Sequence, residues 1–210
     1  MIQKHRKLLL ITSIIILLPI LAGLVMWNQL PEQIPSHWNA AGEIDGWASK
    51  PFFVFGLPLI LVAAQWLCVL GTNADPKKKN HSDKVLHLVL WIIPVISVFL
   101  HTATYCEVLG TEVRMEVIMP IFIGIVFTII GNYLPKCKQN YTIGIKIPWT
   151  LNSEENWNKT HRFAGKLWTV CGLAMILTGF FGGFWVSLPI VLLMVLAPFL
   201  YSYSLHRKGV

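Results

Sequence analysis

Some side chains in this sequence are of types that carry out acid–base or metal chemistry, and they fall into three groups. The groups are His37 with Glu43 and Asp45, His87 with His101, and His161 with Glu154 and Glu155. Their spacings match no known metal-ligand motif, and the four cysteines form no CxxC pair. The strings HExxH and GxSxG and a P-loop are also absent. We therefore expect no metal, no cofactor and no catalytic residue, in a protein that is not an enzyme.

The pair His87 and His101 allows a second interpretation. Both lie in one apolar stretch, spaced by seven residues from Pro94, with Ser97 on the same helix face. Ionisable residues at membrane depth are functional candidates, so a small transporter or ion pathway using this face is the alternative function. Neutral histidines packed against helix carbonyls are the simpler interpretation. The sequence has neither a charged pair at mid-membrane nor an inverted repeat, and these are the features that would support transport.

The composition shows which elements must position these groups. Of the 210 residues, 55% are hydrophobic and 13% are charged, about half the usual charged share. A soluble protein of this size could not cover its surface with so little charge. Six stretches have roughly the 20 apolar residues that a membrane-spanning helix needs. They are Leu8–Trp27, Phe52–Leu70, Val85–Tyr105, Val117–Leu134, Phe163–Phe181 and Phe184–Tyr203. The sequence predicts an all-α integral membrane protein with six transmembrane helices.

The basic residues predict the orientation. If the N-terminus is cytoplasmic, 15 of the 17 Lys and Arg residues fall on the inner side, and only Lys50 and Arg114 fall outside. The positive-inside rule then predicts a multi-pass plasma-membrane protein with both termini in the cytoplasm. The net charge of +7 is explained by this topology, so we expect no direct nucleic-acid binding. Anionic lipids at the inner face are an expected partner of these basic residues.

We divide the chain into three parts on this basis. Residues 1–72 form an N-terminal unit of two helices with an outer loop, residues 73–134 hold the third and fourth spans, and residues 135–210 hold a long cytoplasmic loop with the last two spans. Glycines recur every seven residues in the fourth and fifth spans, at Gly124 and Gly131 and at Gly165, Gly172 and Gly179. Each set lies on one helix face and predicts close packing of a neighbouring helix.

The long outer loop, residues 30–51, is rich in prolines, turn residues and tryptophans. Pro31 and Pro35 favour an extended entry, and residues 34–38 alternate as a short strand does. Residues 39–42 and the pair Asp45-Gly46 predict turns. We expect a compact lid with exposed aromatic side chains, which suits a peptide or lipid partner.

The long inner loop, residues 135–162, contains an alternating isoleucine run that Pro148 ends. Asn152 and Glu155 have the spacing of a capping box and predict a helix start. That helix carries Trp157, Thr160, His161, Ala164 and Trp168 on one side. The loop is either a membrane-surface elbow or a specific site or docking surface.

Two strings in these loops resemble a known family. The string IPxHWNxxGxxDGWxSK, residues 34–50, is similar to the short N-terminal domain that often precedes the SdpI family. The string NxxxGIKxPWTL, residues 140–151, followed by NWxxTHR, residues 156–162, resembles the SdpI signature itself. The resemblance covers most of the chain. It departs from the family at Lys146, where Arg is usual, and lysine lacks the bidentate donor fork of arginine.

The resemblance implies a bacterial plasma-membrane immunity protein. Such a protein protects its own cell from an extracellular SdpC-like peptide toxin, and it could also signal by holding a cytoplasmic autorepressor at the membrane. The toxin-facing residues it implies are Pro35, His37, Trp38, Asn39, Gly42, Asp45, Gly46, Trp47 and Lys50. The cytoplasmic motif residues are Gly144, Lys146, Pro148, Trp149, Thr150, Trp157, Thr160, His161 and Arg162.

Overall fold

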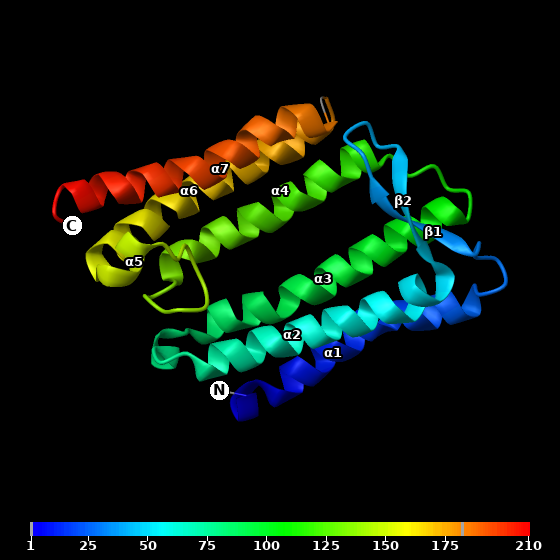
Figure 1. Ribbon diagram of the computed structural model, residues 1–210, viewed down its shortest axis with the longest axis horizontal. Coiled ribbons are helices and arrows are strands. Elements are labelled where there is room, and N and C mark those ends of the chain that lie inside the picture. Colours follow the sequence, from blue (N-terminus) through cyan, green and yellow to red (C-terminus); the bar gives the residue numbers. More distant parts are fainter. Residues whose placement is uncertain (1, 182) are drawn as a thin grey trace. The chain divides into compact units, whose positions relative to one another are not determined.

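A computed structural model describes residues 2–181 and 183–210. Most of this part of the chain is helical (Figure 1). It divides into two compact units. The first, which we call the hairpin unit, contains Met1–Asn73 and His87–Met115; the second, the motif unit, contains Ala74–Leu86 and Glu116–Val210.

The hairpin unit is built on three helices. They are α1 (Ile2–Val25), α2 (Leu57–Ala74) and the part of α3 (Asp83–Val108) that begins at His87. Polar side chains join α1 to α2 inside this apolar bundle. Gln65 Nε2 donates to Thr12 Oγ1 at 2.6 Å, and Trp66 Nε1 donates to Ser13 Oγ at 3.2 Å. Such bonds satisfy polar groups that would otherwise be costly in a membrane interior.

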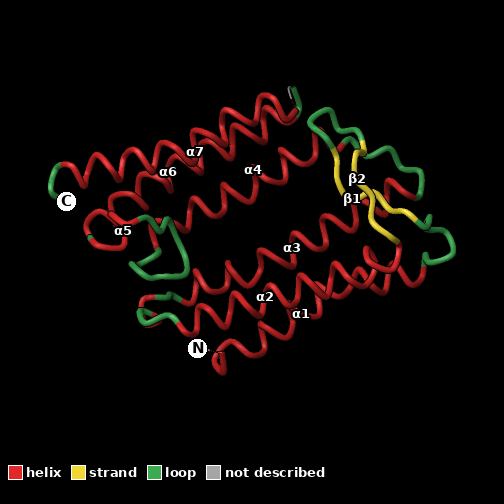
Figure 2. The backbone as a smooth tube through the Cα atoms, in the orientation of Figure 1, coloured by secondary structure: helices red, strands yellow, loops and turns green. Residues whose placement is uncertain are grey.

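The long loop after α1 folds into an antiparallel hairpin of β1 (Gln33–Trp38) and β2 (Ile44–Ser49), drawn in yellow in Figure 2. The strand predicted over residues 34–38 is confirmed, and so is the turn after it. Asn39 Oδ1 accepts the N–H groups of Ala41 and Glu43 at 2.8 and 3.1 Å, and Gly42 has a φ of +84°. The turn predicted at Asp45-Gly46 is wrong. Both residues lie within β2, because the Asn39 turn already reverses the chain.

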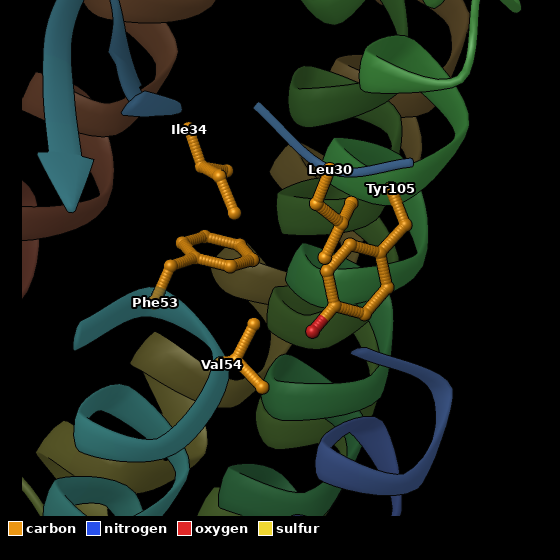
Figure 3. Close-up of a cluster of buried hydrophobic side chains, with 5 residues drawn as sticks. All are labelled: Leu30, Ile34, Phe53, Val54 and Tyr105. Carbon is orange, nitrogen blue, oxygen red and sulfur yellow. The ribbon is translucent and has the colours of Figure 1, made fainter. Parts of the chain in front are cut away.

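A cluster of buried apolar side chains lies where the hairpin joins the helices (Figure 3). It contains Leu30, Ile34, Phe53, Val54 and Tyr105. Ile34 points from β1 onto the ring of Phe53, which belongs to the short π-helix η1 (Phe52–Gly56) at the start of α2. Ile34 and Val54 are fully buried. This apolar contact holds the base of the hairpin on the bundle.

The motif unit contains the remaining helices. They are η2 (Lys78–Asn80), α4 (Met115–Tyr133), η3 (Leu134–Lys136), α5 (Pro148–Asn152), α6 (Glu154–Gly179) and α7 (Gly183–Arg207). Helices α6 and α7 lie side by side (Figure 1).

The glycine spacings mark the contact between α4 and α6. A Cβ built on Gly124 would lie 2.6 Å from the Gly172 carbonyl oxygen, and one on Gly131 would lie 2.8 Å from that of Gly165. Side chains at these positions would push the two helices apart. The close packing predicted from the spacing is therefore confirmed.

Within the described residues, five helices are long and apolar enough to cross a membrane. They are Gln3–Val25, Phe52–Ala74, Asp83–Val108, Met115–Lys136 and Trp185–Arg207. The fifth predicted span falls in α6, whose interior carries Lys166, threonine and several glycines that lower its hydropathy. A multi-pass membrane protein fits these helices, whereas the count of six and the cytoplasmic termini stay predictions.

Candidate functional site

The loop between η3 and α6, which we call the motif loop (residues 137–151), leads directly into the polar start of α6. The helix start predicted from Asn152 and Glu155 is wrong by one residue. The N-cap is Ser153, whose Oγ accepts the Asn156 N–H at 3.1 Å. Asn152 instead ends α5, which packs against α6 and α7.

Two aromatic side chains of α6 hold the motif loop from one side. Trp157 is fully buried, and its Nε1 donates to the Cys137 carbonyl at 2.7 Å. His161 stacks on Trp157 with ring centroids 4.0 Å apart, and its Nε2 accepts the Ile145 N–H at 2.9 Å. Gly144 is the point of closest approach. Its φ is +124°, and a Cβ there would lie 2.5 Å from His161 Nε2.

The two hydrogen bonds of His161 define its protonation state. Nδ1 faces the Trp157 carbonyl at 2.8 Å and must donate, while Nε2 faces an N–H group and must accept. Only the neutral imidazole can do both. Burial lowers the pKa of His161 to about 4, which agrees with this geometry. His161 is therefore a buried structural group with both ring nitrogens bonded to the backbone, whereas Glu154 and Glu155 are exposed.

Other motif residues join the loop to α7. The Trp149 ring lies between 5.0 and 5.9 Å from the rings of Phe199, Tyr203 and His206, which all belong to α7. Buried Thr150 accepts the Ile147 N–H through Oγ1 and donates to the Ile145 carbonyl at 2.8 Å. These contacts fix the turn that starts α5.

Asn156 is a central residue of this packing that we did not include among the predicted site residues. It is fully buried. Its Nδ2 donates to the Ser202 carbonyl at 3.0 Å, and its Oδ1 accepts from Ser202 Oγ at 2.6 Å and from Thr160 Oγ1 at 3.1 Å. The sequence signal that could have identified Asn156 is its position as the first residue of the NWxxTHR string. Thr160, which we did select, acts through Asn156.

The remaining motif residues face outward. Lys146, Pro148 and Arg162 are exposed. Lys146 Nζ donates to the Thr142 carbonyl at 2.9 Å, a single acceptor that does not require the arginine fork. The motif thus separates into a buried set that shapes the loop and an exposed set that is available to other molecules.

The residues of the hairpin likewise divide into some that hold the strands together and some that are exposed. His37 Nδ1 pairs with Asp45 Oδ1 across the strands, and Asn39 Nδ2 donates to Glu43 Oε2 at 2.9 Å. A Cβ on Gly46 would lie 2.8 Å from the Cβ of His37, so glycine is needed opposite the histidine. Trp47 is 57% exposed, whereas Trp38 is half-buried and Pro35 is buried.

Lys50, one of the predicted toxin-facing residues of the outer loop, is 6% exposed. Its Nζ donates to the Leu30 carbonyl at 3.0 Å, pairs with Glu32 Oε1 at 2.7 Å and lies over the Trp27 ring at 5.0 Å. The charge therefore joins the two ends of the loop. A buried ammonium group needs such partners to offset its desolvation.

The two histidines of α3 lie in different surroundings. His101 is 1% exposed and packs against Phe53 and Tyr105, and its Nδ1 donates to the Ser97 carbonyl at 2.8 Å. His87 Nε2 lies 3.3 Å from His5 Nδ1. His101 therefore has the packed environment of a structural histidine.

Among the described residues there is no group of three or more His, Cys, Asp and Glu side chains arranged to hold a metal ion. The cysteines at 68, 106, 137 and 171 are all free thiols. Burial raises the pKa of Cys137 to about 11, so its reactive thiolate form is disfavoured.

The helices and the two shaped loops define a multi-pass membrane protein with a structured hairpin and a structured motif loop. Comparison with known proteins shows the family of the chain. The profile described as "SdpI/YfhL protein family" matches residues 136–202, and that of "Domain of unknown function (DUF1648)" matches residues 14–62. The chain is 30% identical to "Immunity protein SdpI" of Bacillus subtilis (strain 168) over 201 residues, which cover 94% of this chain and 95% of that protein. The chain belongs to the SdpI family. No solved structure matches it significantly.

Proposed function

We propose that this protein is a membrane immunity protein that protects its cell against an extracellular peptide toxin related to SdpC. The observation that carries the proposal is the 30% identity to an immunity protein over nearly the whole of both chains. The match covers 94% of this chain, and the two family profiles match residues 14–62, which contain the hairpin, and residues 136–202, which contain the motif loop.

In this proposal the hairpin is the toxin-facing element. His37 and Asp45 tie the strands to each other, and Lys50 ties the end of the hairpin to Leu30, in the segment that follows α1. The Trp47 indole is left exposed on this frame. An exposed tryptophan on a rigid hairpin is a good anchor for a peptide, because little conformational freedom is lost on binding. The hairpin would face outward if both termini are cytoplasmic.

The motif loop would then lie on the cytoplasmic side. Its exposed residues, Lys146, Pro148 and Arg162, are available to a repressor protein or to anionic lipid headgroups. Signalling would require two conformations that bind toxin with different affinity. The packing of His101 offers no support for the alternative of an ion pathway.

Expression in a toxin-sensitive strain that lacks its own immunity gene tests the proposal. Cells that make the protein should survive toxin doses that kill cells carrying the empty vector. Equal killing of both strains, with the protein present in the membrane, would refute the immunity function.

A second experiment tests the role of the hairpin. Trp47→Ala should lower the tolerated dose while membrane abundance stays near wild type, since an aromatic anchor contributes about 2 kcal/mol or more. Trp185→Ala, which changes an exposed tryptophan of α7, is the matched control and should keep full tolerance. Unchanged tolerance of the Trp47 variant would count against a toxin-binding hairpin.

A further inference from the structure

The segment between α2 and α3 makes a set of contacts that no sequence motif indicated. Asp75 directly follows α2, and its side chain is fully buried. Its Oδ1 accepts the Lys77 N–H at 2.7 Å. Its Oδ2 accepts the Tyr141 N–H at 2.9 Å, Thr142 Oγ1 at 3.0 Å and His81 Nε2 at 3.2 Å.

These bonds connect two segments that are far apart in the sequence. Lys77 and His81 belong to the α2–α3 segment, whereas Tyr141 and Thr142 belong to the motif loop. Burial alone would raise the pKa of Asp75, but the bonds from Lys77, Tyr141 and Thr142 lower it below its usual value. The buried carboxylate is therefore charged at neutral pH and attracts its donors strongly.

Neighbouring residues extend the connection. Asn80 Nδ2 donates to the Gln139 carbonyl at 2.7 Å, and Lys77 Nζ donates to Gln139 Oε1. Gln139 Nε2 in turn donates to the carbonyls of Thr150 and Leu151 at 2.8 and 2.9 Å. The contact made by the α2–α3 segment therefore reaches α5. In addition, Val85 packs with Cys137 and Trp157 in one buried cluster.

The segment that makes this contact with the motif loop is continuous in the chain with helices of the hairpin unit. Residues 74–86 belong to the motif unit, although the rest of α2 and most of α3, which flank them in the sequence, belong to the hairpin unit. The motif loop is thus bonded to a segment that is covalently joined, at both ends, to helices of the hairpin unit.

We propose that Asp75 and His81 are positioning residues that lock the motif loop in its folded conformation. They act through Tyr141 and Thr142, whereas Trp157 and His161 bond to other residues of the loop, Cys137 and Ile145. The biological role of this lock rests on the proposed function, in which the conformation of the motif loop transmits the response to toxin. The lock itself can be tested without toxin.

Cys137 is a native reporter of the lock, since it is buried in a cluster with Val85 and Trp157 against which Ile143 and Leu151 of the loop pack. In isolated membranes at constant pH, N-ethylmaleimide labelling of Cys137 is followed by peptide mass spectrometry. Thr142→Val removes the hydroxyl and keeps the side-chain shape, so Cys137 should react about tenfold faster than in the wild type. Thr142→Ser keeps the hydroxyl and should react near the wild-type rate.

Asp75→Asn removes the charge and should also speed labelling, while Lys79→Gln, a change of an exposed residue in the same segment, should not. Wild-type labelling rates in both Thr142→Val and Asp75→Asn would overturn the lock, as would equal rates in Thr142→Val and Thr142→Ser. Faster labelling with unchanged toxin tolerance would instead support the lock and count against a role of the loop in immunity.

Discussion

Replacing Gly144 with alanine tests whether α6 really shapes the motif loop. The residue has a φ of +124°, which L residues rarely adopt. The new Cβ would lie 2.5 Å from His161 Nε2 and 2.9 Å from Trp157 Cζ2. Both rings are buried, so neither can move aside without disturbing its own hydrogen bonds.

The expected loss of stability has two parts. The backbone strain costs about 1–3 kcal/mol. Displacing the His161 ring leaves the Ile145 N–H without its acceptor, which adds about 1–3 kcal/mol. Gly110 is a matched control, because it has a φ of +90° and nothing within 4 Å of an added Cβ. Gly110→Ala should show only the first part.

Equilibrium unfolding of the detergent-solubilised protein, followed by tryptophan fluorescence, measures both variants. We expect Gly144→Ala to be less stable than Gly110→Ala by about 1–3 kcal/mol. The double variant Gly144→Ala/His161→Ala should be more stable than the sum of its single changes implies, because alanine at 161 removes the closest contact. Equal stability of the two glycine variants would refute the contact between the loop and α6.

The other predictions concern pH, helix packing and an exposed base. His161 has a folded pKa of about 4, below the usual 6.5, so the unfolded chain binds its proton first as the pH falls. The free energy of unfolding should drop by about 3 kcal/mol at most between pH 6.5 and 4, and unfolding titrations of His161→Gln should show a smaller drop. Gly172→Ala should cost about 1–3 kcal/mol in the same assay, since its Cβ would lie 2.5 Å from the Gly124 carbonyl oxygen. Gly71→Ala, in helix α2 with open space around it, should be neutral or stabilising by up to about 1 kcal/mol, and stabilisation by Gly172→Ala would contradict the α4–α6 contact. Lys159→Arg should leave toxin tolerance unchanged, because the exposed pair with Glu155 contributes about 1 kcal/mol or less; lost tolerance would indicate a specific contact.

Several features followed from the sequence because their signals are local. Apolar length predicted the membrane class, and the seven-residue glycine spacing predicted a face for close helix packing. Asn39 and Gly42 indicated the hairpin turn, since an Asx side chain and a glycine with positive φ are sufficient to make it. The two loop motifs were specific enough to indicate the SdpI family.

Only the tertiary structure decided which motif residues are buried. Lys50 and His161 are polar residues that a sequence places by default at the surface, but each has partners that make burial possible. Asp75 shows the reason most clearly. Its donors at Tyr141 and Thr142 lie 66 and 67 positions along the chain, so no local pattern marks it. Whether a polar side chain in this protein is a contact for another molecule or a support for a loop depends on such distant partners, which only folding brings together.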